Sequence, residues 1–65
     1  MKQAFTVHVW RDGDWWIAQC QEFEIASQGE TAEEAAENLR EALALYFEPL
    51  PRRELSLVRE RGEEI

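Results

Sequence analysis

The chain has few of the residues that stabilise a very small domain through disulfides or metal sites. Its 65 residues include one cysteine, one histidine, three glycines and two prolines. A single cysteine cannot form an internal disulfide, and one cysteine with one histidine cannot complete a zinc site. Domains of this length are marginally stable alone, and a disulfide, a metal or a partner usually compensates. Because the sequence excludes the first two, it predicts a homo-oligomer, a dimer or higher.

Positive charge is equally scarce. Seven lysine and arginine residues face 14 aspartate and glutamate residues, which gives a net charge of −7. Phosphate contacts need clustered basic residues, so this balance argues against nucleic acid or an anionic membrane and favours a basic partner. The opening MKQAFTVHVW has no continuous apolar signal region, and no apolar run reaches membrane-spanning length. We expect a cytoplasmic protein without cofactor or metal.

Two strands open the chain. Residues 4–10 and 15–20 alternate apolar and polar types with period two, and Asp12-Gly13 between them predicts a two-residue hairpin turn. This turn pairs Trp10 with Trp15 across the hairpin. One face is then wholly apolar: Phe5, Val7, Val9, Trp16, Ala18 and Cys20. The other face is mixed: Thr6, His8, Trp10, Trp15, Ile17 and Gln19.

A capped helix follows a short third strand over 23–28. The stretch TAEE predicts a capping box, with Thr31 at the N-cap and Glu34 three positions later. It opens a helix over 32–47 whose apolar stripe is Ala35, Leu39, Ala42, Leu43 and Tyr46.

The end of the chain completes the predicted fold. Residues 54–58 predict a fourth strand at the sheet edge, and 59–65 predict a frayed, charged tail. The sequence therefore predicts one α+β domain over 1–65. We expect an antiparallel sheet of three to four strands in β-β-β-α-β order, with the helix on one face.

One helix can cover only one face of such a sheet. Trp10, Trp15 and Ile17 remain on the other face, with His8 among them. Scattered exposed apolar residues are common and need no special cause, which is one interpretation of this patch. Aromatic residues are, however, enriched at the centres of interfaces, and these three cluster on one small face. We therefore expect Trp10, Trp15, Ile17 and His8 to form an oligomer or partner interface.

Two stretches, DWWIAQC and IASQGETAEEAAENLREALALYFE, resemble the HicB-like antitoxin family of bacterial type II toxin–antitoxin systems. The resemblance extends from about Phe5 to Glu48, and its most specific part runs from Ser27 to Ala35. It implies a partial ribonuclease-H-like layer and a non-enzymatic function. Such proteins bind and neutralise HicA, a small basic toxin that cleaves messenger RNA.

Many members of that family also carry a C-terminal DNA-binding module. Only residues 47–65 follow Tyr46 here, which is too few for a separate module. The resemblance therefore predicts a stand-alone version of the N-terminal domain, with no separate DNA-binding domain.

A row of acidic residues follows the polar side of the expected helix. Glu33, Glu37 and Glu41 recur at four-residue spacing. They are either the solvated face of an amphipathic helix or a surface that attracts a basic toxin. We expect the second role for Glu33, Glu37 and Glu41 if the chain is an antitoxin.

Two other function classes remain open. One is a homo-oligomeric structural or small-ligand-binding protein without a toxin partner. The other is a residual metal-dependent nuclease, which needs several carboxylates converging on two metal ions. The aspartates, Asp12 and Asp14, flank the hairpin turn, where turn propensity already explains them. Cys20 and His8 fall on opposite faces of the hairpin, so no nucleophile and base are paired. We expect no catalytic residues.

Overall fold

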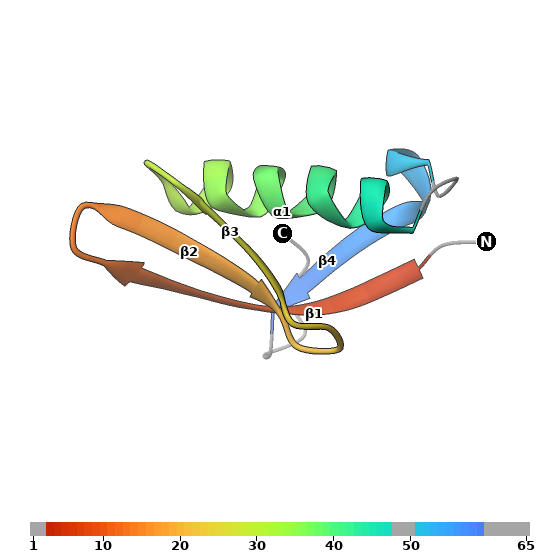
Figure 1. Ribbon diagram of the computed structural model, residues 1–65, viewed down its shortest axis with the longest axis horizontal. Coiled ribbons are helices and arrows are strands. Elements are labelled where there is room, and N and C mark those ends of the chain that lie inside the picture. The colour runs from red at the N-terminus through yellow and green to blue at the C-terminus, as the bar shows by residue number, and fades with distance from the viewer. Residues whose placement is uncertain (1–2, 48–50, 60–65) are drawn as a thin grey trace.

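The computed structural model describes residues 3–47 and 51–59. They form four strands, one α-helix and one short 3-10 helix (Figure 1). The elements are β1 (Gln3–Asp12), β2 (Trp15–Cys20), β3 (Ile25–Gly29), α1 (Ala32–Tyr46), η1 (Arg52–Glu54) and β4 (Leu55–Arg59).

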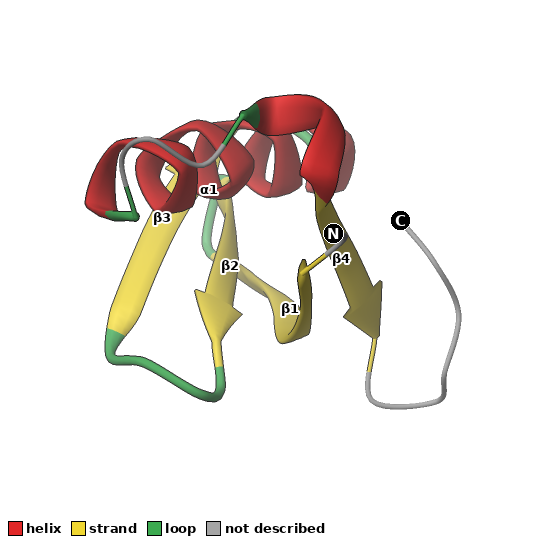
Figure 2. Ribbon diagram, turned by 90° about the vertical axis from the view of Figure 1, so that its right-hand side faces the viewer, coloured by secondary structure: helices red, strands yellow, loops and turns green. Residues whose placement is uncertain are grey.

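The strands form a single sheet in the order β3-β2-β1-β4, and α1 lies across one face of it (Figures 1 and 2). This confirms the predicted α+β class and the β-β-β-α-β order. The sheet is mixed rather than wholly antiparallel, because β4 pairs parallel to β1. Since α1 carries the chain back along the sheet after β3, β4 must run in the direction of β3 and β1.

The hairpin register differs from the predicted one by two residues. Trp10 pairs with Ile17, and Trp15 pairs with Asp12, so the predicted Trp10–Trp15 pair is wrong. The loop is Gly13-Asp14, and Gly13, with φ +64°, is the only one of the described residues with a positive φ. A type I′ turn at the predicted loop Asp12-Gly13 would need a positive φ at both loop residues. A type II′ turn needs a positive φ only at its first loop residue, and in the observed loop that residue is Gly13. The even shift keeps every side chain on its predicted face.

The core lies between α1 and the sheet. It holds the predicted apolar face of the hairpin together with the inner side of α1 and two residues of β4. Its buried members are Phe5, Val7, Ala18, Cys20, Ala35, Ala36, Leu39, Leu43, Leu55 and Leu57. Tyr46, predicted on the apolar stripe, is instead 63% exposed, and its ring lies against those of Phe23 and Phe47 outside the buried core.

The capping box forms at the start of α1 as the sequence predicts. The Thr31 hydroxyl accepts a hydrogen bond from the Glu34 N–H at 3.0 Å. The Glu34 carboxylate in turn accepts from the Glu30 N–H at 3.2 Å, one residue before the N-cap. The first bond satisfies an N–H group that the first helical turn leaves without an intrahelical partner, and the second joins Glu34 to the residue before the N-cap instead of to the N-cap N–H of a standard capping box.

Two polar side chains of α1 reach the two edge strands. Asn38 donates to the Gln28 carbonyl of β3 at 2.9 Å, and Arg40 donates to the Leu55 carbonyl of β4 at 2.8 Å. Helix and sheet are therefore joined by hydrogen bonds at both edges as well as by the apolar core between them.

The C-terminal strand has the predicted length of five residues but lies one residue further along the chain. β4 includes Arg59, the first residue of the expected frayed tail, and the rest of that tail lies outside the described residues. In the part of the chain that the structure describes, no helix is long and apolar enough to cross a membrane.

Candidate interaction surfaces

The face of the sheet opposite α1 is not covered by any described element (Figure 2). We call it the open face. It consists of alternate residues of the four strands, which the pairings align across the sheet. They are Ala4, Thr6, His8, Trp10, Asp12, Trp15, Ile17, Gln19, Ala26, Gln28, Ser56 and Val58.

The four residues predicted to form an interface all lie on the open face. Trp10 and Trp15 are 37% and 44% exposed, and Ile17, the cross-strand neighbour of Trp10, is half-buried. The rings of Trp10 and His8 meet edge to face, with centroids 5.1 Å apart. Trp15 lies diagonally from Trp10 instead of directly opposite it. The sheet therefore brings the predicted interface residues together, though in a different register.

Two hollows lie beside this apolar group. One, of about 420 Å³, is lined by His8, Trp10, Gln19 and Gln21. The other, of about 300 Å³, is lined by Ile17, Ala26, Ser27 and Gln28. The open face thus combines exposed indoles with recesses on the same surface, and its polar lining groups are mostly uncharged amides.

The acidic residues of α1 lie on the other side of the molecule. Glu33, Glu37 and Glu41 are all exposed, as the sequence predicts. Arg40 lies 3.5 Å from the Glu37 carboxylate, so one of the three charges has a basic neighbour on the same helix. Because α1 packs on the face opposite the open face, the acidic surface and the indoles point in opposite directions.

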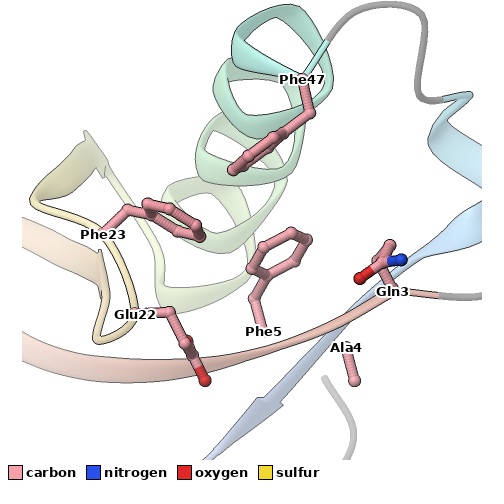
Figure 3. Close-up of a pocket in the computed structure, with 6 residues that line it drawn as sticks. All are labelled: Gln3, Ala4, Phe5, Glu22, Phe23 and Phe47. Atoms are coloured by element: carbon pink, nitrogen blue, oxygen red, sulfur yellow. The ribbon is translucent and has the colours of Figure 1, made fainter.

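A third surface feature, which the sequence reasoning missed, is a cluster of aromatic rings at the end of α1. Phe5 of β1, Phe23 of the β2–β3 loop and Phe47 after α1 turn toward one another (Figure 3). Their ring centroids are 4.9 to 6.1 Å apart. With Gln3, Ala4 and Glu22 they line a hollow of about 490 Å³. The sequence placed Phe23 in a strand, and only the position of the loop reveals that it meets the other two rings.

Glu22 holds the loop beside this hollow. Its carboxylate accepts from the Thr6 N–H of β1 at 2.8 and 3.1 Å and from the Cys20 thiol at 3.5 Å. Partial burial raises the pKa of Glu22, but hydrogen bonds from Thr6 and Cys20 outweigh it, so the pKa lies below the usual value for glutamate. Burial raises the pKa of the Cys20 thiol, which keeps it protonated and poorly nucleophilic.

The lowered pKa of Glu22 predicts a pH-dependent contribution to stability. Ionised Glu22 stabilises the folded chain fully above its unfolded pKa, about 4.3, and this contribution is lost as the pH falls through the lower folded value. Glu22→Gln should therefore lower the melting temperature by a few degrees at pH 7, with the difference from wild type shrinking toward pH 3. Thermal unfolding followed by circular dichroism measures this.

The matched control is Glu24→Gln, an exposed position in the same loop. It removes the same charge without touching the Thr6 N–H. If both variants melt alike at pH 7, the contact between Glu22 and Thr6 does not stabilise the fold.

The described residues contain no group of three or more His, Cys, Asp or Glu side chains that could hold a metal ion. Asp12 ends β1 and Asp14 lies in the hairpin loop, both exposed. His8 lies on the open face and Cys20 is buried beneath the other face, as the alternation predicts. The residues considered for metal binding or nucleophilic catalysis therefore lie apart in the described part of the chain.

Comparisons with known proteins identify one family. No curated protein and no solved structure gives a significant match. A family model does match over residues 2–64, nearly the whole chain, and its description is a family of unknown function. The chain therefore belongs to the family described as DUF7387.

Proposed function

We propose that this chain is a non-enzymatic, cytoplasmic binding protein of the HicB-like antitoxin type. It binds a small basic ribonuclease toxin of the HicA type and masks it, and it acts as a homo-oligomer. The observation that carries this proposal is the separation of surfaces: an acidic helix on one side of the domain and an apolar sheet face on the other.

The acidic helix supports the first half of the proposal. A net charge of −7 attracts a basic protein, and Glu33, Glu37 and Glu41 present part of that charge on one exposed helix. A toxin that binds messenger RNA needs a basic surface for phosphates. Binding that surface to acidic side chains blocks access of RNA by steric and electrostatic means, and it requires no chemistry from this chain.

The aromatic hollow supports a second candidate function. Its volume of about 490 Å³ and its lining by three phenylalanine rings suit a small apolar ligand. This would make the chain a homo-oligomeric small-ligand-binding protein without a toxin partner. The two candidates differ in what the chain binds in its own cells.

The decisive experiment uses the reading frame next to the gene for this chain. If that frame encodes a small basic protein, we expect its purified product to cleave messenger RNA and to lose this activity when the chain is added in equal amount. Native mass spectrometry should then show both proteins in one complex. An unaffected cleavage rate, with no complex formed, would overturn the antitoxin proposal and leave the second candidate.

The acidic surface gives a sharper test of the same proposal. The triple variant Glu33→Gln, Glu37→Gln and Glu41→Gln should weaken binding of the basic protein about tenfold, because three exposed ion pairs contribute up to roughly 0.5 kcal/mol each. Isothermal titration calorimetry measures the affinity.

A control variant with the same change in net charge is Asp12→Asn, Asp14→Asn and Glu24→Gln, whose residues lie away from α1. It should weaken binding much less than the helix variant. Equal losses would mean that net charge, not the surface of α1, attracts the partner.

A further inference from the structure

We propose that a second copy of this chain covers the open face, so that two sheets pack face to face about a two-fold axis with both acidic helices on the outside. This deepens the proposed function, because it names the surface and the occupant of the self-association. Four observations support it: the open face exposes apolar side chains, it carries few charges, the edge strands of the sheet are short and hydrogen-bonded to α1, and hollows lie beside the indoles.

The open face exposes more apolar surface than a small monomer needs to expose. Trp10 and Trp15 are 37% and 44% exposed, and Ile17 lies between Trp10 and the edge strand β3. A typical sheet that is covered on one face shows polar side chains on the other. Here aromatic and aliphatic groups occupy the part of the face next to the hairpin loop, and such residues are typical of the cores of interfaces between proteins.

The low charge of the open face favours a second copy of this chain over a basic partner as its occupant. On the open face, only Asp12, at the end of β1, and His8 are ionisable among the described residues. Two chains of net charge −7 repel one another unless their charged surfaces stay apart, and face-to-face packing of the sheets places both copies of α1 outermost. A basic partner gains little on this nearly neutral face and gains more on the acidic helix.

The sheet edges are less suited to self-association than its face. Both edge strands, β3 and β4, have only five residues, and short edge strands resist pairing with another chain. Moreover, the Gln28 carbonyl of β3 and the Leu55 carbonyl of β4 already accept hydrogen bonds from Asn38 and Arg40. These bonds tie each edge strand to α1.

The shape of the open face is suited to a two-fold interface, in which the same patch meets itself. Its indoles project next to two shallow, open hollows. Two copies related by a two-fold axis bring the indoles of each against the recesses of the other. This arrangement covers Trp10, Trp15 and Ile17 at once.

Sedimentation velocity of the full chain alone, without any basic protein, tests the proposal. We expect wild type to sediment as a species of twice the 7.7 kDa of one chain. Trp15→Lys should weaken self-association at least about 100-fold, since a buried tryptophan is a frequent hot spot and a two-fold interface contains the substitution twice. The matched control is Leu45→Lys, at a position 67% exposed on α1, which should remain dimeric.

A second measurement keeps the test decisive if Trp15→Lys fails to fold. Acrylamide should quench the tryptophan fluorescence of wild type more strongly after dilution to nanomolar concentration, because the indoles become exposed as the dimer dissociates. The proposal is overturned if wild type is a monomer at all concentrations with unchanged quenching, or if Leu45→Lys dissociates while Trp15→Lys does not. Either result leaves the proposed binding of the basic protein to α1 untouched. A monomer at all concentrations would also overturn the homo-oligomeric part of the proposed function, whereas the toxin-binding part is tested by the cleavage assay alone.

Discussion

Replacing Leu39 by alanine is expected to leave much of the protein unfolded at room temperature. Leu39 is fully buried, near the middle of the helix stripe that packs on the sheet. Leucine-to-alanine changes at such sites cost about 2–5 kcal/mol, because the side chain leaves a cavity that the surroundings fill only in part. A domain of this size has only about 3–5 kcal/mol of stability from its core. The loss therefore approaches the whole stability of the chain.

Thermal unfolding measures this result. For domains of 60–100 residues, each kcal/mol corresponds to roughly 4–8 °C in melting temperature, so Leu39→Ala should melt at least about 10 °C below wild type. Leu45→Ala is the control, since Leu45 lies on the same helix but is 67% exposed. It should change the melting temperature by no more than a few degrees. Equal shifts for the two variants would mean that the helix does not pack through the predicted stripe.

Gly29→Ala is expected to be nearly as damaging, for the opposite reason. A Cβ atom at Gly29 would lie 2.5 Å from the backbone nitrogen of Ala35 and 2.8 Å from the carbonyl carbon of Glu34. These are helix backbone atoms, so no side chain can rotate away to make room. The first turns of α1 would have to move off β3, which separates Ala35 and Ala36 from the sheet. Overpacking of this kind costs about 1–3 kcal/mol or more.

The neighbouring variant Gln28→Ala provides the comparison. Gln28 is exposed on the open face, and its backbone carbonyl, not its side chain, accepts the hydrogen bond from Asn38. Urea unfolding should therefore show a clear loss of stability for Gly29→Ala and little change for Gln28→Ala. If Gly29→Ala has wild-type stability, the helix does not approach the strand as closely as described.

The positions of the two surfaces allow the two proposed contacts to form on one small domain. The helix must present its apolar stripe to the sheet, so its glutamates face away from it. The sheet must present one face to the helix, so its remaining apolar residues face the other way. A basic partner and a second copy would therefore not compete for the same surface.

The local pattern of residues was sufficient to predict the elements and their faces. Alternation in residues 4–10 and 15–20 determines which side chains enter the core, because successive strand residues point to opposite faces whatever the register. The capping box at Thr31 and the spacing of the helix stripe are equally local. For this reason the α+β class, the element order and the position of Trp10, Trp15, Ile17 and His8 on the uncovered face were predictable.

Only the tertiary structure decided how these elements meet. Two hairpin registers that differ by two residues place every side chain on the same face, so the alternation cannot distinguish them. The structure adopts the register with Gly13-Asp14 as the loop, in which the positive φ falls on glycine. The direction of β4 depends on the path of the helix, and the meeting of Phe5, Phe23 and Phe47 depends on how a loop and a helix end converge. The sequence by itself determined which face of the hairpin and, except at Tyr46, which side of the helix is buried, since periodicity is local. Pairing, strand direction and the aromatic hollow arise from contacts between distant residues, which no local pattern specifies.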